Sequence, residues 1–182
     1  MTATALEGSA APIPSLPADA VVVLVGAAAS GKTTFRRALL AADAAPRAVL
    51  SLDDERLALR ERDSDTGREP RPLQDYSRPA VLRCEAAAQK LLSQRRGYLA
   101  DATHLRRRER IPHVRAAHEA GLPAIAVLLP AVGIDVLRER NGARPELHRV
   151  PDEILERHEH RRSLLSRELL LEEGFDEVVE VR

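Results

Sequence analysis

Residues 21–33 read Val-Val-Val-Leu-Val-Gly-Ala-Ala-Ala-Ser-Gly-Lys-Thr, and this stretch decides the fold. The run from Val21 to Val25 is continuously apolar and mostly β-branched, which is typical of a strand buried on both faces of a parallel sheet. Gly26 follows at once, and residues 34–42 are mainly helix formers with apolar side chains at helical spacing. The sequence therefore predicts a strand, a glycine-bounded loop and a helix in direct succession.

The loop matches the pattern Gly-x-x-x-x-Gly-Lys-[Ser/Thr] in full and has the strand and helix that this P-loop motif requires on either side. Its backbone N–H groups and the start of the helix would cradle a β-phosphate. We expect Lys32 to reach the β- and γ-phosphate oxygens and Thr33 to offer its hydroxyl to Mg²⁺. The predicted cofactors are ATP and Mg²⁺, although the motif does not separate ATP from GTP. The expected nucleotide-binding residues of the loop are Gly26, Ala27, Ala28, Ala29, Ser30, Gly31, Lys32, Thr33 and Thr34.

The rest of the chain continues the alternation of strand and helix. Further strands are expected at 48–52, 98–100, 124–129 and 177–181. Further helices are expected at 79–96, 106–120, 134–140 and 152–172, with an exposed loop at 62–78. This order predicts an α/β fold of the P-loop NTPase kinase type, with about five parallel strands and helices on both faces. By analogy with P-loop kinases, the strand at 21–25 should lie in the centre of the sheet.

Length and composition limit the class of protein. The 182 residues suit one domain, which we expect to occupy residues 20–182 after a disordered tail at 1–19. No apolar run is long enough to cross a bilayer, so no membrane partner is expected. Cys84 is the single cysteine, which excludes an internal disulfide and favours a cytoplasmic location. Since the formal net charge is +0, nucleic acid could be bound only through a local basic groove.

Two carboxylates, Asp53 and Asp54, follow the second expected strand, where open α/β sheets place their chemistry. A carboxylate there can accept the proton of an alcohol and orient it for in-line attack. Arg56 would share a helix face with Asp53 if a helix begins at this point. The alternative is that one Asp caps that helix. Asp101 ends the strand at 98–100 and could bind the Mg²⁺ hydration shell, the alternative again being a capping role.

Arg140 and Arg144 stand four residues apart, so that they would share a helix face. Guanidinium groups suit phosphate oxygens in a closing site, and we expect a lid at about 138–150, with Gly142 and Pro145 breaking the helix. The alternative is a solvated helix end favoured by the helix dipole.

Other polar clusters carry weaker signals. The run Arg106-Arg107-Arg108-x-Arg110 is expected at the solvent-facing start of a helix, with contact to a nucleic-acid backbone as the alternative. His158 and His160 would point to different helix faces, so we expect surface residues and no metal pair. With two Phe, two Tyr and no Trp, extensive base-stacking platforms are not expected.

In order along the chain, the loop, Ser51-Leu52-Asp53-x-x-Arg56, Asp101-Ala102-Thr103 and Glu139-Arg140-Asn141-x-x-Arg144 resemble the P-loop 5'-hydroxyl polynucleotide kinases. More closely, they resemble the kinase module of bacterial polynucleotide kinase-phosphatase end-healing enzymes. The resemblance runs from Val21 to the C-terminus. It implies that Asp53 is the general base on a 5'-OH, that Arg56 contacts an acceptor-side or transferring phosphate, and that Arg140 and Arg144 belong to a lid. His104 stands where this family often has Asn.

The leading hypothesis is an ATP-dependent kinase that phosphorylates the 5'-OH end of a DNA or RNA oligonucleotide. Its catalytic residues would be Asp53, Arg56, Lys32, Arg140 and Arg144, with Thr33 and Asp101 at the metal. One alternative is a kinase acting on the hydroxyl of a small molecule, such as a sugar, a nucleoside or an antibiotic. Another is a regulatory ATPase without an acceptor. The oligomeric state stays open.

Overall fold

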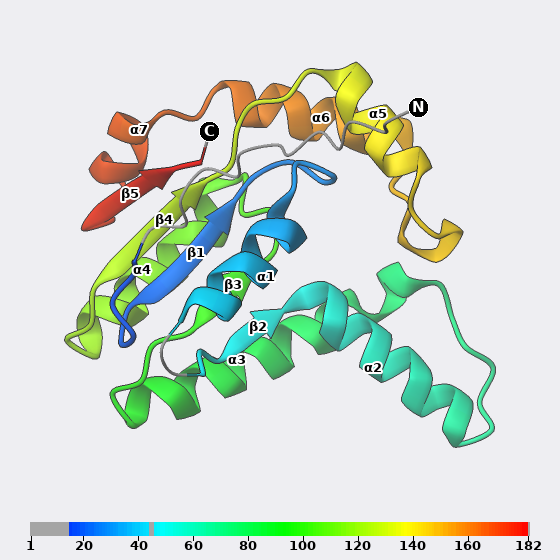
Figure 1. The fold of residues 1–182 in the computed structure, drawn as a ribbon. Coiled ribbons are helices and arrows are strands. Elements are labelled where there is room, and N and C mark those ends of the chain that lie inside the picture. The colour runs from blue at the N-terminus through cyan, green and yellow to red at the C-terminus, as the bar shows by residue number, and fades with distance from the viewer. Residues whose placement is uncertain (1–14, 44–45, 182) are drawn as a thin grey trace, which may run out of the picture.

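The computed structural model describes residues 15–43 and 46–181, which form one all-parallel sheet with helices on both faces (Figure 1). The strand order is β2-β3-β1-β4-β5. The strands are β1 (Val21–Val25), β2 (Val49–Ser51), β3 (Leu99–Asp101), β4 (Ala124–Leu128) and β5 (Glu177–Glu180). The predicted α/β class and the central place of the first strand are confirmed.

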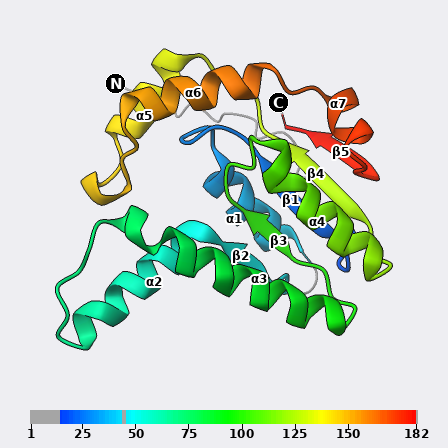
Figure 2. The ribbon, with the colours of Figure 1, turned by 180° about the vertical axis from the view of Figure 1, so that it is seen from behind.

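The helices lie in three places relative to the sheet (Figure 2). Helix α1 (Lys32–Ala42) covers one face, while α3 (Ser77–Ser93), α4 (Arg107–Glu119) and α7 (Arg167–Glu172) cover the other. Helix α2 (Leu52–Asp65) projects from the end of β2 and packs on α3. Helices α5 (Ile134–Gly142) and α6 (Asp152–Ser163) lie past the carboxyl end of β4, joined through the short helix η2 (Glu146–His148). None of the described helices is long and apolar enough to cross a membrane.

Strand β1 is completely buried, as its unbroken apolar sequence predicts. Val21, Val23 and Val25 pack on the side of α4 and α7, whereas Val22 and Leu24 pack on the side of α1. This strand therefore has a core on each side, and it delivers the loop at residues 26–33 from the middle of the sheet.

The exposed loop expected at 62–78 is only partly present. Helix α2 continues to Asp65, a short helix η1 occupies Leu73–Tyr76, and α3 begins at Ser77. The reason is Tyr76, which is 2% exposed and whose hydroxyl donates to the Asp63 carboxylate at 2.7 Å. This buried contact ties the segment back onto α2.

The single helix expected at 152–172 is two helices, α6 and α7. The break follows from local hydrogen bonds at residues 163–166. The Ser166 side chain accepts the Leu169 N–H and starts α7, while the Arg162 guanidinium binds the Leu165 carbonyl at 3.0 Å. These bonds compete with continuation of the first helix.

Residues 1–14 of the expected N-terminal tail lie outside the described residues. Leu16, in the described part of that tail, is 7% exposed and packs in the core cluster on the α1 side. Its carbonyl accepts a hydrogen bond from Arg47 at 3.2 Å. The packed domain therefore begins before residue 20.

Candidate active site

The loop at 26–33 leaves β1 at the carboxyl edge of the sheet and needs unusual backbone conformations. A Cβ on Gly26 would lie 2.8 Å from Leu129 Cβ, so glycine is required for the close approach. Gly31 has φ 105° and Ala29 has φ 62°, both left-handed. The backbone thus accepts a Cβ at Ala29 in this conformation. Alternating conformations of this kind turn successive N–H groups toward one concavity.

The donors of this concavity fit an anionic ligand. Among the described residues, the N–H groups of Ala29, Gly31, Lys32 and Thr33 have no acceptor, and the buried Ser30 hydroxyl has no partner. Buried or converging donors without partners are costly unless a ligand satisfies them. A nucleotide phosphate at the start of α1 would do so.

Lys32 lies at the centre of the site. Its Nζ donates to the carbonyls of Gly26 at 3.1 Å and Ala27 at 2.6 Å. Burial is the main reason why the pKa of Lys32 is lowered to about 8. The negative charges of Asp101 and Asp53 raise this pKa, and the positive charge of Arg144 lowers it further. The charges of three residues predicted from separate motifs therefore act on this ammonium group. Thr33, beside it, has an exposed side chain that fits the predicted place at Mg²⁺.

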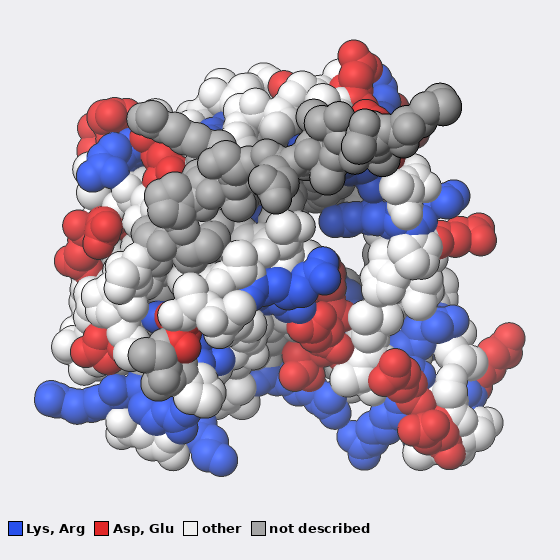
Figure 3. Space-filling view, viewed as in Figure 1, with Lys and Arg blue, Asp and Glu red and all other residues white. Residues whose placement is uncertain are grey.

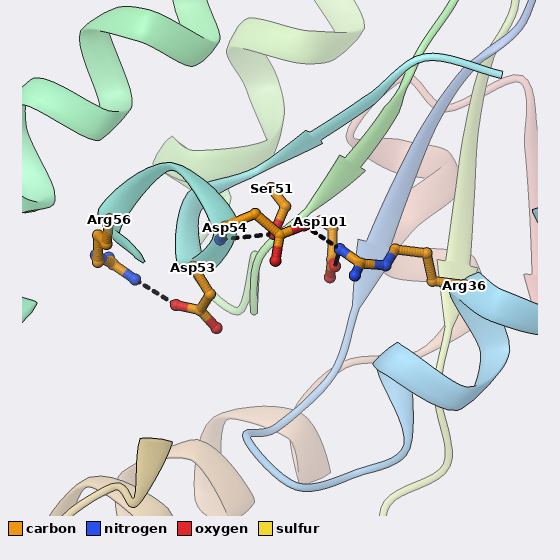
Figure 4. Close-up of polar contacts among 6 residues, drawn as sticks. All are labelled: Arg36, Ser51, Asp53, Asp54, Arg56 and Asp101. Atoms are coloured by element: carbon orange, nitrogen blue, oxygen red, sulfur yellow. Dashed lines mark hydrogen bonds and ion pairs between the residues drawn. The ribbon is translucent and has the colours of Figure 1, made fainter. Parts of the chain in front are cut away.

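Asp53 lies in the first turn of α2, on the open side of the site (Figure 4). The cap of this helix is Ser51, whose hydroxyl accepts the Asp54 N–H at 3.2 Å, so neither aspartate is needed as a cap. The Asp53 side chain is 82% exposed and binds Arg56 at 2.5 Å. Arg56 is held in turn by Ser77 of α3 at 3.1 Å. The carboxylate is thus oriented by a cation yet open to a substrate.

Arg36 is a site residue that sequence reasoning missed. It lies on α1, four residues after Lys32, and its guanidinium binds both Asp54 and Asp101 at 2.8 Å (Figure 4). The helical spacing from Lys32 was the available signal. Burial raises the pKa of Asp101, and the Arg36 charge opposes that rise. Asp101 is therefore a held carboxylate at the strand end, and its charge acts on Lys32.

The lid expected at about 138–150 comprises the second part of α5, the segment between α5 and η2, η2 itself and the residues up to 150. Helix α5 ends at Gly142, so Arg144 lies past the helix and does not share its face with Arg140, contrary to the sequence expectation. Asn141 closes the segment by bonding both the N–H and the carbonyl of Val150, at 3.0 and 2.9 Å. The molecular surface is hollowed between this segment and α2, with charged side chains gathered around the hollow (Figure 3). Arg144 lies near Lys32, whereas Arg140 is exposed on the last turn of α5.

Two expectations for basic residues need correction. Arg110 is not at the surface: it is 1% exposed and pairs with Glu173 through two hydrogen bonds of 2.5 and 2.6 Å. Arg107 and Arg108 are exposed, as expected. His158 is half-buried against the loop, whereas His160 is exposed. His104 is buried and bonds the Leu24 carbonyl at 2.8 Å, so it does not face an acceptor.

Comparison with solved structures shows the same fold in several proteins. A proposed kinase from Chloroflexus aurantiacus is 19% identical, with a TM-score of 0.62 over 91% of this chain and 88% of that one. A gluconokinase from Sinorhizobium meliloti 1021 is 20% identical, with a TM-score of 0.53 over 90% and 82%. A structure from the PezAT chromosomal toxin–antitoxin system of Streptococcus pneumoniae is 18% identical, with a TM-score of 0.65 over 88% and 65%.

Sequence comparison places the chain in a family. No curated protein matches it significantly. The sequence profile of the family described as "AAA domain" matches residues 21–165, which include the loop, Asp53, Asp101 and the expected lid. This match covers most of the chain and agrees with the P-loop kinase-type fold. The protein therefore belongs to the AAA domain family.

Proposed function

We propose that the protein is an ATP-dependent kinase that transfers the γ-phosphate to a hydroxyl group of a small molecule, such as a sugar or a nucleoside. The observation that carries the proposal is that the charges of Asp53, Asp101 and Arg144, which come from separate motifs, all act on Lys32 of the phosphate-binding loop. A phosphate-binding loop and an accessible carboxylate are the two parts that transfer to an alcohol requires.

Each part has a chemical task. The free N–H groups and Lys32 bind the phosphates, with Lys32 exchanging its carbonyl partners for phosphate oxygens. Thr33 and Asp101 would hold Mg²⁺, which would supply positive charge to offset that of the phosphates. Asp53 accepts the hydroxyl proton, and Arg56 keeps its carboxylate oriented. Arg144 and, after closure, Arg140 stabilise charge on the transferring group.

The side chains at the surface favour a small acceptor. All four aromatic residues of the chain are buried, with exposed fractions of 6% or less, so none offers a platform for nucleobases: Phe35, Tyr76, Tyr98 and Phe175. The formal net charge of +0 adds no general attraction to a polyanion. The gluconokinase among the similar structures supports the same choice, because it acts on a small molecule.

A second candidate is the 5'-hydroxyl polynucleotide kinase reaction. Arg107 and Arg108 favour it, because both are exposed at the start of α4 and could contact a phosphate backbone. The order of the motifs around Asp53, Asp101 and Arg144 also resembles that family.

One assay separates these readings. The protein is incubated with γ-labelled ATP and Mg²⁺, in parallel with a pool of sugars, sugar acids and nucleosides, with 5'-OH DNA and RNA oligonucleotides, and without acceptor. Label in the small-molecule pool supports the proposal, and label on oligonucleotides supports the second candidate. Release of free phosphate alone would indicate an ATPase. A Lys32→Ala variant controls for contaminating kinases.

A further inference from the structure

Helix α6 turns one face toward the loop and the end of β4. The residues of this face follow at spacings of three and four: Leu155, His158 and Arg162. Leu155 is 1% exposed, and the buried Arg162 donates to the Leu129 carbonyl at 2.6 Å. His158 thus occupies the middle of a stripe that fixes α6 over the carboxyl edge of the sheet.

His158 bonds the loop directly. Its Nδ1 accepts the backbone N–H of Ala28 at 3.4 Å. An N–H donor requires an unprotonated Nδ1, which places the proton of the neutral imidazole on Nε2. Burial lowers the pKa of His158 to about 4, and four positive charges act in the same direction: Lys32 of α1, Arg161 and Arg157 of α6, and Arg106 before α4. The imidazole is therefore an acceptor at neutral pH.

The first part of the loop is held by contacts with α5 and α6. This part, Ala27 to Ala29, is buried, and Leu137 of α5 packs in one cluster with Ala27 and Ala29. The Ala28 N–H is taken by His158. Among the described residues, the N–H groups on either side of it, of Ala27 and Ala29, have no acceptor, and further free donors follow from Gly31 into α1. The direction of these free donors depends on how firmly the preceding residues are held.

We propose that His158 is a positioning residue of the nucleotide site, which fixes the Ala28 amide and so keeps the following amides directed at the phosphates. Donors held in place before the ligand arrives bind it more tightly, since less conformational freedom is lost on binding. The inference rests on the proposed binding of ATP by the loop. It does not depend on the identity of the acceptor.

Three variants test the proposal through the dissociation constant of a fluorescent ATP analogue with Mg²⁺. His158→Leu keeps bulk but removes the acceptor, and we expect about fivefold weaker binding, the size of one lost hydrogen bond. His158→Asn offers an oxygen near the position of Nδ1, so its affinity should stay within about twofold of the original protein. His160→Leu is the matched control, because His160 is exposed on the same helix. This substitution should leave the dissociation constant unchanged.

Several outcomes would overturn the proposal. If His158→Leu and His158→Asn weaken nucleotide binding equally, His158 has a packing role. If neither variant changes nucleotide binding, His158 has no role in the nucleotide site. Tighter binding in His158→Leu would show that His158 competes with the nucleotide. Thermal unfolding without nucleotide confirms that each variant is folded. If the unaltered protein does not bind the analogue, the proposed function is wrong. An effect confined to the variants bears only on the role of His158.

Discussion

At the scale of single residues, the site is organised by arginines that hold carboxylates. Arg36 keeps Asp54 and Asp101 together, and Arg56 keeps Asp53 toward the open side. The two pairs differ in exposure: the Asp101 side chain is 11% exposed, and that of Asp53 is 82% exposed. A buried, paired carboxylate suits a fixed electrostatic task, whereas an accessible one can exchange a proton with a substrate.

Asp53→Asn tests the proposed base. The amide keeps the shape but cannot accept the hydroxyl proton, so phosphoryl transfer should fall by on the order of 10²-fold or more. The affinity for ATP should stay within about twofold, because the loop is untouched. Asp65→Asn, at the exposed end of α2, removes an equal charge and serves as the control. Near-normal transfer by Asp53→Asn would rule out this role.

At the scale of elements, the segment after α5 carries Arg144, whose charge acts on Lys32, without being a regular helix. Asn141 closes the segment onto Val150, and Arg144 lies inside it. Arg138 links α5 to α6 through Asp152 and Glu156, at 2.6 and 2.7 Å. The segment is thus fastened at its base by α6, the helix that also contacts the loop through His158.

Arg144→Ala should weaken ATP binding by about tenfold, because it removes a charge-assisted contact to phosphate. Isothermal titration with ATP and Mg²⁺ measures the change. Arg107→Ala is the control, since Arg107 is an exposed arginine at the start of α4 that the proposal does not place at the nucleotide. Equal affinities for both variants would contradict a place for Arg144 at the phosphates.

At the scale of the whole molecule, a buried polar network supports the sheet behind the loop. His104 bonds the Leu24 carbonyl of β1, and its ring lies 5.1 Å from that of His113. His113 bonds the Tyr98 hydroxyl at 2.9 Å. Arg110 donates to the His104 carbonyl at 2.7 Å and pairs with Glu173. Every member is buried or nearly so, so stability depends on the charge states of the network.

Acid should destabilise the fold through the two histidines. Burial lowers the pKa of His104 to about 3 and that of His113 to about 4, from an unfolded value of 6.5. Below pH 6.5 the unfolded chain binds more protons, so stability present above that pH is lost as pH falls toward 4. Each histidine contributes up to about 1.4 kcal/mol per pH unit. Urea unfolding at pH 7 and 5 measures this loss.

The matched variants for the pH experiment are His113→Gln and His160→Gln. His113→Gln keeps a partner for Tyr98 but does not titrate, so it should lose less stability between pH 7 and 5 than the original protein. His160→Gln alters an exposed histidine and should leave the loss unchanged. If His113→Gln shows the full loss, the buried state of His113 does not control acid stability.

The buried ion pair gives a further prediction. Glu173→Gln leaves the Arg110 charge unpaired in the core, which should cost about 3–5 kcal/mol in the free energy of unfolding. Replacing both partners by Arg110→Met and Glu173→Leu should recover most of this loss, because no buried charge remains. Urea unfolding of the single and double variants checks both statements. If Glu173→Gln alone is as stable as the original protein, the buried ion pair does not have this effect on stability.

The sequence predicts the parts of this molecule that depend on local patterns. The apolar run at 21–25 and the glycines after it specify a buried strand and a phosphate-binding loop, since both need only neighbouring residues. Arg110 could not be placed in this way: it stands in an arginine run, and its partner Glu173 is 63 residues away. His158 is intermediate, because its spacing from Leu155 indicates a buried stripe but not the amide of Ala28 that it contacts.

The pairing of Arg110 with Glu173 also has a consequence for the order in which the protein is made. The loop is synthesised before the network behind it, which runs through His104 and Arg110 to Glu173, 63 positions after Arg110. Until Glu173 has left the ribosome, Arg110 has no carboxylate to pair with, and the strand that carries the loop lacks its completed support. Nucleotide binding by the nascent chain should therefore appear only after Glu173 has emerged.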